Sequence, residues 1–137
     1  MQVNNPNKKY QSSHSIVFSC QYHVIFCPKY RRKVLVEGVD TRLKELLVEK
    51  QTEYGYELIE AEVMPDHVHL LLSVDPRVGV LSVIAKIKGY SANVLRKEFP
   101  WLRSRLPCLW TRSKFISTVG VVSLDVVKSY IEDQKGK

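Results

Sequence analysis

The sequence has few cysteines, and their arrangement excludes two classes of small protein. Only Cys20, Cys27 and Cys108 occur among the 137 residues, an odd number with no C-x-x-C pair. A disulfide framework needs an even set of cysteines, and a zinc knuckle needs closely spaced pairs. We therefore expect three free thiols.

Long apolar runs are also missing. No stretch approaches the roughly 20 residues that a transmembrane helix needs, and no P-loop marks a nucleotide site. The first residues, "MQVNNPNKKYQSSHS", are polar and contain no hydrophobic signal region. We expect a flexible arm over residues 1–14, a single domain over residues 15–137 and a cytoplasmic location, with no membrane partner and no nucleotide cofactor.

Acidic residues are almost absent from one part of the chain. Residues 77–114 contain nine lysines and arginines against one acid, Glu98, which gives this segment a net charge of +8 in a chain of net charge +7. A second basic group, "PKYRRK", spans residues 28–33. Such asymmetry favours a polyanionic partner, with nucleic acid as the first candidate, although a basic surface that only keeps the protein soluble stays open.

The hydrophobic pattern predicts an α+β domain. We expect a long strand over residues 15–27, followed by a helix over 40–55 with Asp40 as its N-cap. Two strands, over 56–64 and 67–74, are joined at Pro65-Asp66. A helix over 78–100, an irregular stretch, a strand over 114–119 and a helix over 123–134 with Ser123 as its cap complete the order. Strict alternation in 56–64 would place Ile59, Ala61 and Val63 on one face. The order predicts a ferredoxin-like, RNA-recognition-like βαββαβ antiparallel sheet with helices on one face, followed by a C-terminal helix.

Two histidines stand at the start of the predicted strand over residues 67–74. His67 and His69 are two apart, so they project from one face of a strand and can converge on one ion. Two ligands alone hold an ion poorly. A pair of hydrogen-bonded histidines without metal is therefore the alternative.

The C-terminal helix offers a complementary pair. Tyr130 and Gln134 are four residues apart and share one helix face. Tyr10 and His14 have the same spacing but lie in the polar arm, and an ordinary packed tyrosine is the alternative reading of Tyr130. Taken with the two histidines, Tyr130 and Gln134 suit attack by an oxygen nucleophile on a phosphodiester near Mg²⁺ or Mn²⁺.

These residues resemble a known family. "MPDHVHLLLSV" is similar to the His-hydrophobic-His motif of the HUH endonucleases, and "YIEDQ" to the Tyr-x-x-x-Gln of the single-tyrosine HUH transposases, the TnpA-type enzymes of the simplest bacterial insertion sequences. "YHVIFCPKYRRKVL", "KIKGYSANVLR" and "LWTRSKFISTVG" resemble the family in order and spacing, and the resemblance covers residues 15–134. Lys114 departs from the aromatic or small residue expected there.

The resemblance implies an enzyme. His67, His69 and Gln134 would bind Mg²⁺ or Mn²⁺, and Tyr130 would attack a DNA phosphate to leave a 5′-phosphotyrosine and a free 3′-OH. The substrate would be single-stranded DNA with hairpins near the ends of the insertion sequence. The enzyme would be a homodimer whose tyrosine helices dock in trans, with Gly120 as the hinge.

The basic segments supply candidate DNA contacts. Contacts with the DNA backbone are expected from seven cationic residues: Lys29, Arg31, Arg32, Lys86, Lys88, Arg96 and Arg112. Tyr90 is expected to stack on a base. Two other functions stay open. One is a domesticated HUH endonuclease that processes repeated hairpin elements, and the other is a non-catalytic nucleic-acid-binding module.

Overall fold

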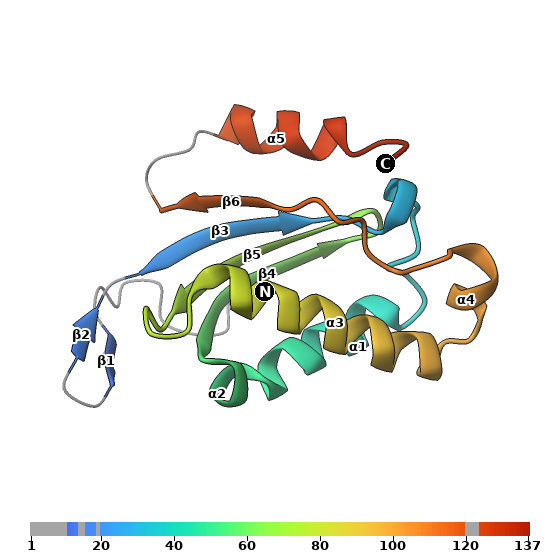
Figure 1. Cartoon of the computed structure of the whole chain (residues 1–137). Coiled ribbons are helices and arrows are strands. Elements are labelled where there is room, and N and C mark those ends of the chain that lie inside the picture. Colours follow the sequence, from blue (N-terminus) through green and yellow to red (C-terminus); the bar gives the residue numbers. More distant parts are fainter. Residues whose placement is uncertain (1–10, 14–15, 19, 120–123) are drawn as a thin grey trace.

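A computed structural model describes residues 11–13, 16–18, 20–119 and 124–137 of the chain (Figure 1). Its centre is an antiparallel sheet of four strands in the order β4-β5-β3-β6. The strands are β3 (Gln21–Phe26), β4 (Tyr56–Met64), β5 (His67–Val74) and β6 (Phe115–Thr118). The predicted ferredoxin-like α+β arrangement is therefore confirmed.

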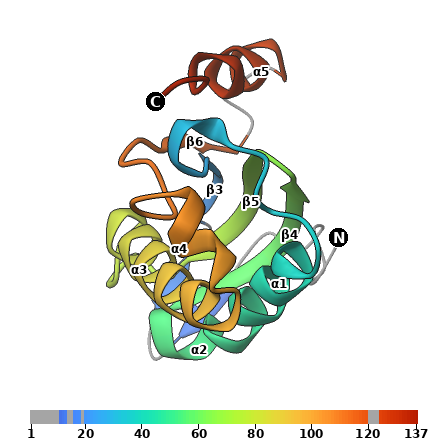
Figure 2. The same ribbon diagram turned by 90° about the vertical axis from the view of Figure 1, so that its right-hand side faces the viewer.

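Helices cover both faces of this sheet. On one face lie α1 (Val39–Glu49), α2 (Gln51–Tyr54), α3 (Val80–Glu98) and α4 (Trp101–Arg105), whereas α5 (Leu124–Asp133) crosses the opposite face (Figures 1 and 2). A short 3₁₀ turn, η1 (Lys29–Arg31), follows β3. In the described residues, no helix combines the length and the apolarity needed to cross a membrane.

The main core lies between the sheet and the first four helices. Strand β5 contributes Val68, Leu70 and Leu72, all fully buried, and helix α3 contributes Val83 and Ile84. Burying one large apolar side chain of this kind favours folding by about 1.5–3 kcal/mol. The three cysteines are free thiols, as expected.

The long strand predicted over residues 15–27 is divided in two. Strand β2 (Ile16–Phe18) pairs with β1 (Gln11–Ser13) in a separate two-stranded sheet, while β3 pairs with β5 and β6. The reason is the length of β5, which ends at Val74, where the Val74 amide donates to the carbonyl of Cys20. The described residues before Cys20, Gln11–Ser13 and Ile16–Phe18, pair with each other and not with the main sheet. Of the predicted arm, only Gln11–Ser13 is described, and it forms β1.

Three details of the helices also differ from prediction. Helix α1 is preceded by Gly38 in the left-handed region (φ +98°), so Asp40 lies in the first turn and is not the N-cap. The predicted helix over 40–55 is divided at Lys50 into α1 and α2. The stretch expected to be irregular contains α4, which follows Pro100; its five residues are too few to show a helical hydrophobic period.

Strand β4 contains a bulge that changes its faces. Leu58 pairs with Leu72 but Glu60 pairs with Leu71, so Ile59 is an extra residue. Tyr56 and Leu58 before it and Ala61 after it therefore all join the core. The prediction of strict alternation is wrong for this reason.

We predict that Gly55→Ala destabilises the protein by about 1–3 kcal/mol, because a non-glycine residue is strained in the left-handed region. Gly55 has φ +80°, and a Cβ atom there would lie 2.7 Å from Cγ2 of Val78. Urea denaturation measures the loss. Gly89→Ala is the control, because Gly89 is helical and a Cβ there meets nothing within 4 Å; it should gain up to about 1 kcal/mol. Equal stability of the two variants would contradict the prediction.

Candidate active site

The predicted histidine pair lies on the sheet face that carries α5. Because side chains alternate along β5, Val68 and Leu70 face the main core and His67 and His69 face the other way. His69 pairs with Ile25 of β3, and Ile25 pairs with Phe115 of β6. These three residues form one row across the sheet, and the ring of Phe115 lies 5.1 Å from the ring of Tyr130 on α5.

His67 is oriented by its sequence neighbour. Its Nδ1 lies 2.8 Å from Oδ1 of Asp66. Burial would raise the pKa of Asp66, but hydrogen bonds from His67 and Arg31, together with the charge of Arg31, lower it below the ordinary value. An ionised carboxylate only accepts hydrogen bonds, so Nδ1 of His67 donates the proton, which leaves Nε2 as the ring atom that can bind an ion. A histidine held by a carboxylate in this way is suited to bind metal.

His69 is kept neutral by its surroundings. Burial, followed by the neighbouring charge of His23, lowers the pKa of His69. Its Nε2 lies 3.1 Å from Nδ1 of His23 on β3, and the two ring centroids are 5.3 Å apart. Neutral imidazole is the form that binds a cation, so this environment favours His69 as a ligand.

Two oxygens without hydrogen-bond partners lie at the C-terminal end of α5. The helix predicted to reach residue 134 ends at Asp133, so Tyr130 belongs to its last turn and Gln134 follows it directly. The Tyr130 hydroxyl and the Gln134 Oε1 atom are buried, and neither has a hydrogen-bond partner among the described residues. Gln134 is only 3% exposed. Buried polar atoms almost always find partners, so two exceptions four residues apart call for a functional explanation.

The Tyr130 side chain lies near Cys27, the residue that follows strand β3. Burial, followed by the proximity of Cys27, raises the pKa of Tyr130 to about 12. Cys27 follows Phe26, whose partner is Val68, so Cys27 stands opposite His67 on the face covered by α5. The structure thus brings Tyr130 and Gln134 over the sheet face that carries His67 and His69.

These residues fit a hard divalent cation. The imidazoles of His67 and His69 and the buried carboxamide oxygen of Gln134 offer nitrogen and oxygen donors without a thiolate. Such a mixed set favours Mg²⁺ or Mn²⁺ over the zinc of a thiolate-rich site. In the described part of the chain, no group of three or more His, Cys, Asp or Glu residues is placed to hold an ion. A site at His67 and His69 therefore needs an oxygen ligand of another kind, which Gln134 offers.

Arg31, expected to contact DNA, is engaged inside the protein. Its Nε donates to Oδ2 of Asp66 at 2.8 Å, and its Nη1 donates to the carbonyl oxygen of Ile131 at 3.0 Å. The Arg31 side chain is 11% exposed. Its neighbours Lys29 and Arg32 are more open, with Arg32 exposed and Lys29 lying over the ring of Tyr30 at 5.3 Å.

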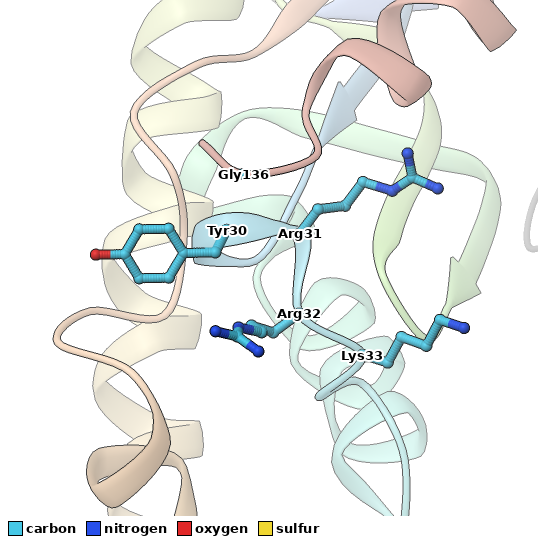
Figure 3. A pocket seen from close by; sticks show the side chains of 5 residues that line it. All are labelled: Tyr30, Arg31, Arg32, Lys33 and Gly136. Carbon is cyan, nitrogen blue, oxygen red and sulfur yellow. The ribbon is translucent and has the colours of Figure 1, made fainter.

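A hollow of about 580 Å³ lies beside this turn, lined by Tyr30, Arg31, Arg32, Lys33 and Gly136. Figure 3 shows that Tyr30 and Arg31 extend in opposite directions from the turn. The side chains diverge, so they do not form a closed pocket for one ligand. The hollow instead presents positive charge next to the C-terminal end of α5.

The remaining predicted DNA contacts do not gather at the histidines. Lys86, Tyr90 and Arg96 belong to α3, on the far side of the sheet from α5 (Figure 2). The ring of Tyr90 packs edge-on against Tyr54, with 6.2 Å between centroids, and Arg96 donates to the carbonyl of Pro107 at 3.0 Å.

Lys88 is engaged inside the protein, whereas Arg112 is exposed to solvent. Lys88 donates to the carbonyl of Thr111 at 2.7 Å, and burial lowers the pKa of Lys88 to about 8. It therefore anchors the loop before β6 from inside. Arg112 is exposed in that loop. Gly120, the predicted hinge, lies outside the described residues.

Sequence reasoning missed Asp66 and His23. The sequence pattern explains Asp66 as a turn residue between two strands. Its position directly before His67 is the local signal for its hydrogen bond to that imidazole. His23 is 46 residues from His69. Only the register between β3 and β5 brings them together, and the sequence carries no local signal for that register.

The chain is similar in sequence to known transposases. Residues 16–134 match the family described as "Transposase IS200 like". The ISDra2 transposase TnpA of Deinococcus radiodurans is 40% identical over 123 residues, which cover 88% of each chain. The transposase for insertion sequence element IS200 of Salmonella typhimurium is 32% identical over 124 residues, 86% of this chain and 81% of that one. The chain belongs to the IS200-like transposase family.

Two solved structures support the fold. A crystal structure of a candidate transposase from Deinococcus radiodurans has a TM-score of 0.80 and 36% identity, covering 93% of this chain and 99% of that one. The structure of a REP-associated tyrosine transposase bound to a REP hairpin has a TM-score of 0.54 and 11% identity, covering 95% of this chain and 69% of that one. At that identity the second likeness shows the fold alone.

We predict that the protein loses stability as the pH falls from about 7 to about 5, partly through His69. The unfolded chain takes up this proton near the ordinary pKa of 6.5, whereas the folded chain takes it up only at a lower pH. Acid therefore favours the unfolded state between the two values. Urea denaturation at several pH values should show a shallower pH dependence in His69→Gln. The same slope in both proteins would refute this role of His69.

Proposed function

We propose that this chain is an insertion-sequence transposase that cleaves and rejoins single-stranded DNA through Tyr130. The observation that carries the proposal is the pair of buried oxygens of Tyr130 and Gln134, at the end of a helix that covers the sheet face bearing His67 and His69. Neither oxygen has a hydrogen-bond partner among the described residues, so the phenol is available to a phosphate and the carboxamide oxygen to a cation.

The reaction is a displacement at phosphorus. The Tyr130 oxygen forms a bond to the phosphorus and releases its phenolic proton to water. The bond from phosphorus to the 3′-oxygen breaks, and this leaving oxygen takes up a proton from water. The products are a 5′-phosphotyrosine and a free 3′-OH. Because the covalent link retains a phosphate ester, attack by a 3′-OH in the reverse direction rejoins DNA without a nucleotide cofactor.

Each protein group has a defined part in this proposal. His67, His69 and Gln134 would hold Mg²⁺ or Mn²⁺, which when bound draws negative charge from the phosphate oxygens. Asp66 fixes the ring of His67 through Nδ1. The ring of Phe115 packs against that of Tyr130 and holds the nucleophile over the sheet.

The DNA partner is proposed from the family and from charge. Relatives more than 30% identical are transposases, and the chain has a net charge of +7. The proposed backbone contacts are the exposed Arg32 and Arg112 and the half-buried Lys29. Lys86, on the far side of the sheet, would meet a longer substrate. Hairpins as the recognised feature, the homodimer and the cytoplasmic location belong to the same proposal. Helix α5 here lies over the sheet of its own chain, and docking in trans, also part of the proposal, would place the partner's α5 in that position.

A domesticated endonuclease that processes repeated hairpins is the nearest alternative. The REP-associated neighbour shares the fold at 11% identity, whereas both named relatives above 30% are insertion-sequence transposases. This difference favours transposition. Paired hairpins just inside the ends of the element that carries the gene would support it further.

We predict a covalent adduct that depends on Tyr130. Incubation with hairpin-bearing single-stranded DNA and Mn²⁺ should give an SDS-resistant protein–DNA band, because the phosphotyrosine bond survives denaturation. Tyr130→Phe removes the nucleophilic oxygen and should abolish the band. Tyr30→Phe is the control, because Tyr30 is exposed, and it should retain the band.

The same assay tests the ion and the alternatives. EDTA or His67→Ala should remove the band while the DNA itself stays intact. An adduct that persists in Tyr130→Phe would assign the nucleophile elsewhere, with Tyr10 the next candidate. Absence of any adduct with the native chain, together with retained DNA binding, would favour a non-catalytic binding module.

We also predict that adduct formation speeds up as the pH rises. Burial raises the pKa of Tyr130 to about 12, so the phenol is protonated near neutral pH. Below that pKa the phenolate fraction grows about tenfold per pH unit, and the phenolate is the better nucleophile. Single-turnover rates at pH 6.5 to about 9 should rise steadily. A flat profile would mean that proton removal from Tyr130 does not limit the reaction.

A further inference from the structure

We propose that Arg31 is a positioning residue that couples docking of helix α5 to the orientation of His67, and so to cation binding at the histidine pair. This inference rests on the proposed function and deepens it. It reassigns Arg31 from a DNA contact to a link between the helix that carries the nucleophile and the residues that hold the ion.

One guanidinium group contacts two distant parts of the chain. Nε of Arg31 donates to Oδ2 of Asp66 at 2.8 Å. Nη1 donates to the carbonyl oxygens of Ile131 at 3.0 Å and Glu132 at 3.4 Å, in the last turn of α5, and also lies 3.4 Å from the Glu132 carboxylate. The planar fork of arginine can make these contacts at once, whereas a lysine ammonium acts as a single point charge.

The link continues from Asp66 to the metal-binding candidate. While Oδ2 of Asp66 accepts from Arg31, Oδ1 accepts from Nδ1 of His67 at 2.8 Å. A chain of hydrogen bonds therefore runs from the backbone of α5 through Arg31 and Asp66 to the imidazole. The side chains of these three residues are only 11%, 15% and 19% exposed, so the contacts are shielded from water and stronger than surface pairs.

Electrostatics explains why the link responds to docking. The carbonyl groups at the C-terminal end of a helix carry partial negative charge, which the guanidinium neutralises. When α5 is docked, Arg31 is held between these carbonyls and Asp66, and Asp66 has one arrangement. When α5 leaves, Arg31 keeps only Asp66, and the carboxylate that orients His67 is less constrained.

The coupling must act in both directions. Gln134, directly after α5, and His67 on β5 are proposed to share one ion, so ion binding favours the docked helix. By thermodynamic linkage the docked helix then raises the affinity for the ion by the same factor. Arg31 adds to this coupling because it ties the same two elements by a second route.

The backbone of Arg31 supports a fixed role rather than an adaptable DNA contact. Tyr30 and Arg31 have φ values of +60° and +53°, in the left-handed region that side chains rarely adopt. This turn sends the Arg31 side chain away from Tyr30 (Figure 3) and into contact with Asp66. A DNA phosphate could reach this guanidinium only in competition with the Asp66 carboxylate and the α5 carbonyls.

The experiment measures ion binding and helix docking without DNA. Mn²⁺ titrations followed by electron paramagnetic resonance give the ion affinity. Hydrogen exchange followed by mass spectrometry gives the protection of residues 124–133 with and without Mn²⁺. The proteins are the native chain, Arg31→Ala, Arg31→Lys and Asp66→Asn. Lys33→Ala is the control, since it removes a positive charge from the exposed part of the same turn.

We expect Arg31→Ala to weaken Mn²⁺ binding by about tenfold, the lower end of the effect of outer contacts at metal sites. Its α5 amides should exchange faster than in the native chain, and Mn²⁺ should protect them less. Arg31→Lys should restore only part of either effect. Asp66→Asn should weaken Mn²⁺ binding with a smaller effect on ion-free exchange, and Lys33→Ala should behave as the native chain.

The proposal would be overturned if Arg31→Ala bound Mn²⁺ as tightly as the native chain and showed the same Mn²⁺-dependent protection of α5. Weaker DNA binding by that variant would not rescue it. If Arg31→Ala did not fold, as judged by circular dichroism, Arg31→Lys and Asp66→Asn would decide in the same two assays. The proposed function is judged separately by the Tyr130-dependent adduct of the native chain. That adduct can form while the coupling fails, whereas a native chain without Mn²⁺ binding at His67 would overturn both.

Discussion

The pairing of β3 with β5 is the constraint on which both the core and the site depend. Because a strand sends alternate side chains to opposite faces, one register places Val68, Leu70 and Leu72 in the core and His67 and His69 under α5. A slip of one residue would bury the imidazoles and expose the leucines. The apolar residues of "HVHLLLSV" therefore do more than fill space, since their burial fixes where the two imidazoles point.

The second face of the sheet is built for chemistry at some cost in stability. The helix that covers it buries a phenol and a carboxamide oxygen without hydrogen-bond partners among the described residues, and each such oxygen costs about 1–3 kcal/mol. A helix that served only to cover the sheet would carry apolar residues there. Two unsatisfied oxygens over the sheet face of His67 and His69 are the departure from good packing that a functional site produces.

Short-range patterns in the sequence predicted most of the fold and the core of the candidate site. The spacing of His67 and His69, and of Tyr130 and Gln134, follows from the periods of strand and helix, so it could be read directly. The contact of His23 with His69 and the contact of Arg31 with α5 depend on register and on helix docking, which no local pattern encodes. The sequence places Asp66 directly before His67, but a turn between two strands already accounts for an aspartate there, so its hydrogen bond to His67 could not be inferred.

The bulge in β4 has a consequence for how the chain can vary. Ile59 is an extra residue, and the strand keeps its core face on both sides of it: Tyr56 and Leu58 before, Ala61 and Val63 after. Deleting Ile59 would give a regular ladder in which all remaining side chains of β4 keep the face they have now. The pairing of residues 60–64 with β5, and so the position of the hairpin that carries His67, does not depend on this one extra residue.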